Sequence, residues 1–275
     1  MMNIDLSINT TLVRDLLTRF IKSEISRTGF SRAVLGLSGG IDSALVAFLA
    51  AEALGAENVL AVRMPYKTSS TESLDHAQLV IDALKIPALT IPITGMADGL
   101  IEQFPEMSNM RKGNIMARCR MLTLYDQSEA FKGLVIGTGN KTEILLGYST
   151  LYGDSAHALN PIGDLYKAQV RELSRAVGVP TVIIDKAPSA DLWAGQTDED
   201  ELGFTYEQAD RLLFLLVDQR FNPQECIEAG FEKKFVDLVS NRIRRNHFKR
   251  VMPPVAKISS RTANYDFLYI RDWGT

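Results

Sequence analysis

The chain has 275 residues, of which 46% are hydrophobic, so it can bury a complete core in one large α/β domain. Its formal net charge of −3 argues against a bulk binder of nucleic acid or of a membrane surface. Its two cysteines, Cys119 and Cys226, lie far apart and match neither a zinc site nor a disulfide framework, which favours a reducing compartment.

The first predicted element is a helix that begins after Asn9 or Thr10 and ends at Gly29, because its apolar residues recur at helical spacing. The segment before it lacks the basic stretch, apolar core and cleavage site of a signal peptide. No apolar run in the chain is long enough to cross a bilayer. We therefore expect a soluble, cytoplasmic protein without a membrane partner.

Strands and helices then alternate along the chain. Short apolar runs bounded by turn residues predict buried strands, and longer segments with helical spacing predict the helices between them. The expected strands are 33–37, 58–63, 88–93 and 133–136. The expected helices are 42–54, 70–84, 111–131 and 167–177, with a short extended piece at 182–184. This alternation predicts a doubly wound parallel sheet with helices on both faces, whose ligands bind at the carboxyl ends of the strands.

The pattern changes in the last third of the chain. Residues 185–204 are acidic and contain several turn formers, so they predict a loop or flap. Helices are expected again at 205–217 and 231–246, which gives a helical C-terminal extension. The chain shows neither an internal repeat nor a low-complexity segment. The sequence therefore predicts one domain over residues 1–275.

The first functional motif is the turn between the first strand and the second helix. Its residues are Gly36, Leu37, Ser38, Gly39, Gly40, Ile41, Asp42 and Ser43. Backbone N–H groups and the helix dipole favour an anion at such a turn. Asp42 would repel a phosphate unless Mg²⁺ lay between them. The motif has neither the lysine of a kinase-type P-loop nor the spacing of a dinucleotide fingerprint. The alternative is an ordinary strand–turn–helix corner that Asp42 caps.

The motif SGGIDS after an apolar strand resembles the loop of the ATP-pyrophosphatases, which include GMP synthetase, asparagine synthetase, tRNA thiolation enzymes and NAD synthetase. Later segments are similar to those of the NAD synthetases, in the same order. These segments are NIMARCRM (114–121), GTGNKTE (137–143), YGD (152–154), PIGDLYK (161–167), PSADL (188–192), QTDEDELG (196–203) and KR before PP (249–254). The resemblance to the NAD synthetase family covers nearly the whole chain.

The resemblance implies a role for each matching residue. Residues 36–43 would hold the phosphates of ATP, the co-substrate, with further contacts from Thr138, Lys167 and Ser189. The residues implied for metal binding are Asp42 and Glu143 for one Mg²⁺, with Asp154 as a candidate for a second metal. The residues implied for deamido-NAD are Arg118, from the other subunit of a homodimer with its active site near the interface, and Lys249, which would close over the dinucleotide.

The implied reaction is the ATP-dependent amidation of deamido-NAD with ammonia, giving NAD, AMP and pyrophosphate. It would proceed through an adenylated carboxylate, because oxide is a very poor leaving group. Asp42 and Lys167 would be the catalytic residues, since the departing pyrophosphate must be neutralised. Only a short segment precedes the first helix, so we expect no amidase domain and direct use of ammonia.

Four positions depart from the family pattern. Leu151 replaces a lysine, Ala158 an aspartate that often contacts deamido-NAD, Phe248 a histidine, and Ser189 a threonine. The ATP half of the chain therefore matches better than the deamido-NAD half. Two alternatives stay open, which are another adenylating ATP-pyrophosphatase, such as a tRNA-modifying enzyme, and a non-catalytic nucleotide-binding protein.

Several of these residues also have ordinary structural interpretations. Glu143 alone resembles a first-turn helix acid, Lys167 a solvated helix residue and Asp154 a turn acid. The C-terminal basic residues could form a nucleic-acid patch, but a solvated helix face is the commoner reason for such a cluster. We expect that face for Arg242, Arg244 and Arg245, and a lid for Lys249.

Overall fold

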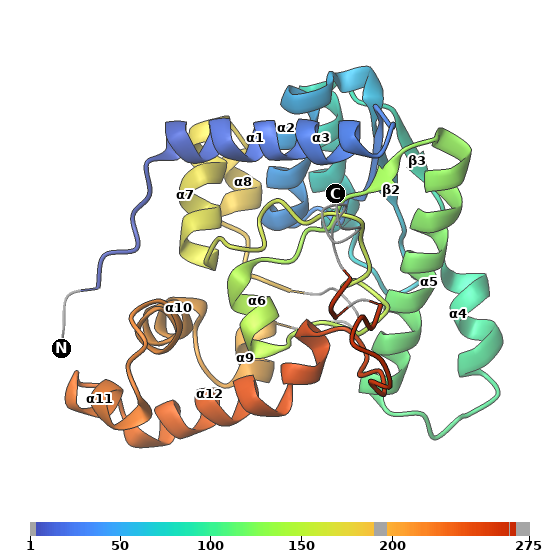
Figure 1. Cartoon of the computed structure of the whole chain (residues 1–275). Helices are drawn as coiled ribbons and strands as arrows, with labels where there is room; N and C mark the ends of the chain where they lie inside the picture. Colours follow the sequence, from blue (N-terminus) through green and yellow to red (C-terminus); the bar gives the residue numbers. More distant parts are fainter. Residues whose placement is uncertain (1–3, 190–196, 264, 268–275) are drawn as a thin grey trace.

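The computed structural model, which describes residues 4–189, 197–263 and 265–267, contains a four-stranded parallel sheet with helices packed around it (Figure 1). The strands are β1 (Ala33–Gly36), β2 (Val59–Arg63), β3 (Ala88–Thr90) and β4 (Leu134–Val135), in the order β3-β2-β1-β4. Ala33 pairs with Val59 on one side and with Leu134 on the other. The predicted parallel sheet is confirmed.

Helices cover both faces of this sheet. On one face lie α1 (Thr10–Arg27), α2 (Ile41–Leu54), α3 (Thr71–Leu84), α7 (Lys167–Val177) and the short α8 (Thr181–Ile184). On the other face α5 (Asn109–Phe131) packs against the strands, and α4 (Thr94–Ile101) packs against α5. Ala33 and Leu35 of β1 point to the face covered by α2, whereas Val34 points to the face covered by α5. This alternation is what a strand buried between two helical layers requires.

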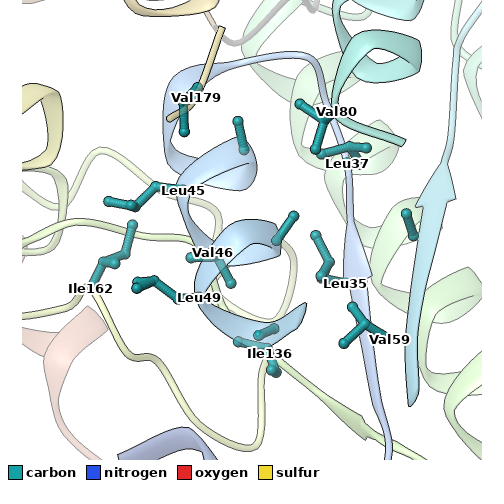
Figure 2. Close-up of a cluster of buried hydrophobic side chains, with 14 of the residues drawn as sticks. Leu35, Leu37, Leu45, Val46, Leu49, Val59, Val80, Ile136, Ile162 and Val179 are labelled. Atoms are coloured by element: carbon teal, nitrogen blue, oxygen red, sulfur yellow. The ribbon is translucent and has the colours of Figure 1, made fainter. Parts of the chain in front are cut away.

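Helix α2 runs through the middle of the larger core. Its sequence is apolar on nearly every side, which is typical of a helix that is buried all round. Figure 2 shows Leu45 and Leu49 of α2 on the side of Ile162, while Leu35 of β1 and Val59 of β2 lie on the sheet side. This packing fixes the helix and therefore the turn that precedes it.

The order of the strands places the ends of β1 and β4 side by side. The chain runs from β1 outward to β2 and β3, and then returns to add β4 on the opposite side of β1. Such a reversal creates the crevice at the carboxyl ends of the strands where ligands of α/β sheets bind. Residues 36–43 follow β1 and residues 137–140 follow β4, so both segments lie at this crevice.

A second hydrophobic core joins the C-terminal helices, which confirms the predicted helical extension. The C-terminal helices are α9 (Asp198–Leu202), α10 (Tyr206–Leu213), α11 (Pro223–Glu228) and α12 (Lys233–Arg245), and α6 (Lys141–Leu146), which precedes them in the chain, packs on the same core. Shorter turns complete the chain, namely η1 (Ala56–Asn58), the π-helical η2 (Phe214–Asp218) and η3 (His247–Arg250). Among the described residues, none of the helices combines the length and the hydropathy that spanning a bilayer requires.

Two local predictions are wrong. Residues 182–184 are helical in α8 rather than extended. The backbone N–H groups of Ile183 and Ile184 donate to the carbonyl of Pro180, and both side chains are buried, so local bonds and packing override β propensity. Part of the predicted flap is the helix α9, which Thr197 caps through the backbone N–H of Asp200. Residues 190–196 of that flap lie outside the described residues.

Some boundaries also differ from the prediction. Strand β3 ends at Thr90, three residues before the predicted end at 93, and helix α10 gives way to the π-helical η2 after Leu213. Helices α4, α6 and α11 were not expected. They have six to eight residues each, so hydrophobic periodicity has little length over which to appear.

Candidate active site

The turn after β1 owes its shape to a glycine and two serines. Gly39 has a φ of +80°, and a Cβ atom there would lie 2.1 Å from the carbonyl oxygen of Ser73, so only glycine fits. The Ser43 hydroxyl accepts from the Ser38 N–H at 3.2 Å and donates to the Gly40 carbonyl at 3.0 Å. The backbone N–H of Gly40 donates to Ser38 Oγ at 3.2 Å. These bonds hold the turn closed on itself.

Helix α2 begins without a side-chain cap, because its N-cap residue is Gly40. The first N–H groups of a helix have no partner within the helix. Ser38 is exposed on the open side of the turn, whereas Gly39 and Ile41 are buried. This arrangement can bind an anion through backbone N–H groups and the helix dipole. Asp42 lies in the same first turn.

Three charged side chains from three helices meet beside this turn, and we call them the carboxylate–lysine cluster. Lys167, at the start of α7, is only 3% exposed. Its Nζ lies 2.6 Å from Asp42 Oδ2 of α2 and 3.3 Å from Glu143 Oε1 of α6. The structure therefore brings together three residues that the sequence assigned to ATP and metal binding, although they are distant in the chain.

The electrostatics of the cluster keep Lys167 charged but disfavour the charge of Glu143. Burial alone lowers the pKa of Lys167, but the carboxylates of Asp42 and Glu143 outweigh it, so the pKa is raised and the ammonium stays charged. Burial raises the pKa of Glu143 to about 7; Lys167 opposes this shift and the Asp42 carboxylate adds to it. A further cation close to Glu143 would favour its ionised form.

Asn140 joins two members of the cluster, a role that was not expected from the sequence. This residue is fully buried. Its Nδ2 donates to Asp42 Oδ1 at 2.9 Å, and its Oδ1 accepts from the backbone N–H of Glu143 at 3.0 Å. Asn140 is the N-cap of α6 and forms a capping box with Glu143. The N-x-x-E spacing after a strand is the signal that could have found it.

The remaining residues predicted for ATP lie at the same edge of the sheet or lead into the predicted flap. Thr138 is half-buried just after β4. Ser189 is exposed, next to the residues that are not described. Before it, Lys186 Nζ contacts Ser73 Oγ at 3.1 Å and Glu72 Oε2 at 3.3 Å, in the first turn of α3. The start of the predicted flap is therefore anchored next to the glycine turn.

Arg118 and Lys249 both bind the backbone of one loop, residues 147–154. Arg118 of α5 donates from Nη2 to the carbonyl of Leu151 at 3.2 Å. Lys249 Nζ donates to the carbonyls of Gly147 and Ser149 at 2.7 and 2.6 Å. The loop follows α6, which also supplies one carboxylate of the carboxylate–lysine cluster. The loop that Arg118 and Lys249 bind is therefore joined directly to α6, the helix that carries Glu143.

Asp154 and the departures from the family pattern have simple surroundings. Asp154 Oδ1 accepts from the backbone N–H of Thr150 at 2.7 Å, as a turn acid does. Leu151 contacts Arg118 through its carbonyl, so this contact does not depend on the side chain that differs. Ala158 is exposed and donates its N–H to Val135, and Phe248 is exposed. Within the described ranges, no group of three or more His, Cys, Asp or Glu side chains is arranged to hold a metal.

The C-terminal basic residues do not form one solvated face. Arg244 and Arg245 are exposed, as predicted. The prediction for Arg242 is wrong, because its side chain is half-buried and its guanidinium lies 6.0 Å from the ring centre of Tyr148. This face of α12 packs on the second core, so Arg242 covers an aromatic side chain instead of pointing into water. Cys119 is buried in a hydrophobic cluster.

The parallel sheet, its switch point and the glycine turn define an α/β protein of the ATP-pyrophosphatase type. Residues 13–253 match the model of the NAD synthase family, and the chain belongs to that family. It is 58% identical over 269 residues to the NH(3)-dependent NAD(+) synthetase of Trichlorobacter lovleyi, with 98% of each chain covered.

Solved structures have the same fold. The NMN synthetase from Francisella tularensis matches with a TM-score of 0.82 and 32% identity, over 92% of this chain and 100% of that one. The NH3-dependent NAD synthetase from Campylobacter jejuni, in complex with a nitrate ion, matches with a TM-score of 0.78 and 33% identity, over 91% and 100%. The predicted family and fold class are therefore confirmed.

Proposed function

We propose that this protein is an ammonia-dependent NAD synthetase, a ligase that forms a C–N bond. It converts deamido-NAD, ATP and ammonia into NAD, AMP and pyrophosphate through an adenylated carboxylate. The observation that carries this proposal is the carboxylate–lysine cluster beside an uncapped glycine turn, at the switch point of the sheet. The similarity to a named NH(3)-dependent synthetase over 98% of the chain supports it.

In this proposal the protein contributes position and charge. Residues 36–43 bind the phosphates of ATP through backbone N–H groups, with Thr138 and Ser189 as further contacts. Lys167 donates hydrogen bonds to the departing pyrophosphate and offsets its negative charge, which is the largest change in charge during adenylation. Arg118 and Lys249 hold deamido-NAD.

Asp42 and Glu143 are the residues that would hold Mg²⁺. Their carboxylates converge on one ammonium, at 2.6 and 3.3 Å, so they lie close enough to share a ligand. Mg²⁺ is commonly bound by one or two carboxylates together with phosphate oxygens, which fits this pair. When bound, the ion supplies positive charge to the phosphate oxygens. Asp154 is the candidate for a second ion.

We also propose that the chain acts as one synthetase domain and forms a homodimer with its active site near the interface. The supporting observation is an apolar face on α5 that includes Leu122 and Tyr125, which are 59% and 43% exposed. Arg118 lies four residues before Leu122, so the three side chains share one face of the helix. The deamido-NAD contact assigned to Arg118 would then lie close to the second subunit.

The test of the proposed reaction is a panel of carboxylic acids incubated with ATP, Mg²⁺ and ammonium. We expect pyrophosphate release and amide formation with deamido-NAD. The panel includes the carboxylate form of nicotinamide mononucleotide, because the Francisella tularensis protein is an NMN synthetase. A clear preference for the mononucleotide would show that it, and not deamido-NAD, is the substrate. If no acid caused pyrophosphate release, the protein would be a non-catalytic nucleotide-binding protein.

The nitrogen donor is tested separately with the purified protein. We expect turnover with ammonium and little with glutamine, because the Trichlorobacter lovleyi protein, similar over 98% of the chain, is named an NH(3)-dependent synthetase. Equal rates with glutamine as the sole donor would contradict direct use of ammonia.

A further inference from the structure

A buried carboxylate holds the end of α7 from which Lys167 projects. Asp210 of α10 is fully buried, and its Oδ2 accepts from the backbone N–H of Ala168 at 2.8 Å. Its Oδ1 accepts from the hydroxyl of Thr142 at 2.5 Å. The same hydroxyl oxygen accepts from the backbone N–H of Lys167 at 3.1 Å. One carboxylate and one hydroxyl therefore bind the first two N–H groups of α7.

These contacts differ from an ordinary helix cap because they come from other helices. Within α7, Gln169 Oε1 accepts from the backbone N–H of Tyr166 at 2.9 Å, but no side chain of the N-cap residue binds the first N–H groups of the helix. Thr142 belongs to α6 and Asp210 to α10, so the additional bonds tie three helices together at one point. The relative positions of α6 and α7 are fixed there.

The bonds also act on the two members of the carboxylate–lysine cluster that α6 and α7 carry. Thr142 is the residue before Glu143. The backbone of Lys167 is bound by the Thr142 side chain, and the ammonium of Lys167 contacts the Glu143 side chain. Lys167 is therefore held at both ends by adjacent residues of α6. Loss of the backbone bond would leave Lys167 bound to these two residues through its long side chain alone.

Burial of an acid at position 210 lowers the stability of the fold, so its presence indicates a role that a nonpolar residue could not fill. Burial disfavours the charged carboxylate, and well-packed hydrophobic residues are often at least as stabilising in such places. Both oxygens of Asp210 instead accept hydrogen bonds from Thr142 and Ala168. Those bonds lead to the helix end that positions Lys167.

We propose that Asp210 is a positioning residue that acts through Thr142 and through the backbone N–H of Ala168 to keep the Lys167 ammonium between Asp42 and Glu143. This proposal rests on the proposed function, in which Lys167 meets the departing pyrophosphate. A cation displaced by about 1 Å from its productive position can cost about a hundredfold in rate. Asp210 and Thr142 touch no substrate in this proposal, so they affect turnover through the carboxylate–lysine cluster and mainly through Lys167, whose backbone Thr142 binds.

The test compares the full-length protein with Thr142→Val, which keeps the shape of the side chain and removes the hydroxyl. We expect kcat for pyrophosphate release to fall at least about tenfold, with KM for deamido-NAD changed less than about twofold. Thr142→Ser, the matched control, keeps the hydroxyl and restores kcat. Asp210→Asn provides the same comparison if Thr142→Val does not fold. Wild-type kcat in both Thr142→Val and Asp210→Asn would overturn the proposal.

A double-mutant cycle separates positioning from a general loss of structure. In a Lys167→Met background, Thr142→Val should reduce the residual rate by less than about twofold, because its effect passes mainly through Lys167. An equal fold-loss in both backgrounds would overturn the proposal.

Crystal structures of the wild type and Thr142→Val keep the test independent of the substrate. We expect Lys167 Nζ to move away from Asp42 and Glu143 by about 1 Å or more, the scale at which positioning affects rate. An unchanged Nζ position would overturn the proposal even if the protein turned over no deamido-NAD. Absence of turnover in the wild type would contradict the proposed function alone.

Discussion

The side chain of Lys167 shows how one charge is made available at this site. A lysine ammonium that is 3% exposed would be destabilising alone, because burial disfavours the charged form. Two carboxylates, at 2.6 and 3.3 Å, reverse this effect, so the pKa of Lys167 is raised. The result is a fixed cation that is already largely desolvated before an anion arrives. Such preorganised charge is the kind that stabilises a transition state most effectively.

The first prediction at this scale concerns Asp42→Asn. The amide keeps the size of the side chain, so we expect the far-ultraviolet circular dichroism to match the wild type. It removes a charge that would bind Mg²⁺ and that balances Lys167, so kcat should fall about a hundredfold or more. Turnover is measured across a Mg²⁺ titration, and a chelator should abolish the wild-type rate. Full activity of the variant at saturating Mg²⁺ would remove Asp42 from the metal-binding role.

The second prediction concerns the effect of Asp210 on stability. Burial raises the pKa of its carboxyl from 3.8 to about 6, and the hydrogen bonds from Thr142 and Ala168 only partly oppose this shift. Between these two pH values the folded state holds a proton that the unfolded state has released. The contribution of this group to stability therefore falls as the pH rises through this window and is constant above it.

Urea unfolding of the wild type and Asp210→Asn at several pH values checks this sign. From about pH 4 to about pH 7, the free energy of unfolding of the wild type should fall relative to the variant by up to about 3 kcal/mol. Parallel pH profiles of the two proteins would show that Asp210 titrates normally.

At the scale of elements, the part of the site that is local in sequence could be predicted, and the part that depends on packing could not. The β1–turn–α2 unit was predictable because a buried strand must be apolar and a tight turn needs glycine. The meeting of Asp42, Glu143 and Lys167 depends on which strands are neighbours, which spacing along the chain does not reveal. The family resemblance supplied that part. Neither the spacing of residues nor the family resemblance predicted the bonds of Asp210, because an acid within a short helix carries no local signal of its distant partners.

Gly39→Ala tests how closely α3 approaches the glycine turn. A Cβ atom at this position would meet the backbone oxygen of Ser73 at 2.1 Å, and the φ of +80° is unfavourable for alanine. Because backbone cannot rotate aside as a side chain can, we expect a loss of about 2 kcal/mol or more in stability and weaker ATP binding. Thermal unfolding and ATP titration provide the two measurements.

Gly99→Ala is the matched control for this substitution. Gly99 lies within α4, and a Cβ atom there would have no neighbour within 4 Å. Alanine has the higher helix propensity, so this variant should be neutral or slightly stabilised. Equal behaviour of the two variants would contradict the importance of the contact between Gly39 and Ser73.

At the scale of the whole molecule, the candidate site lies where the two hydrophobic cores meet. Asp42 is carried by α2 of the larger core, whereas Glu143 and Asp210 are carried by helices of the second core. Lys167 begins the helix α7, which contacts both α2 and α10. The carboxylate–lysine cluster and its support from Asp210 are therefore complete only when the two cores are packed against each other. This requirement explains why residues so far apart in the chain all bear on one ammonium.

The same scale includes the proposed second subunit, which Leu122→Asp tests. Leu122 is 59% exposed on the face of α5 that also carries Arg118, so a charge there should disfavour burial against a second copy. We expect the wild type to sediment as a dimer and Leu122→Asp as a folded monomer. Turnover of deamido-NAD should be lower in the monomeric variant than in the wild type, because the substrate contact of Arg118 is proposed to lie at the interface.

Leu238→Asp on α12 is the control, because Leu238 is 45% exposed and belongs to a different helix. It should remain dimeric and active, which would show that an added charge on an exposed leucine is not harmful in itself. A monomeric wild type would refute the homodimer outright. If Leu122→Asp were monomeric and had wild-type turnover, the wild type would still be a dimer but catalysis would not require dimerisation. Arg118 would then have to bind substrate within its own subunit.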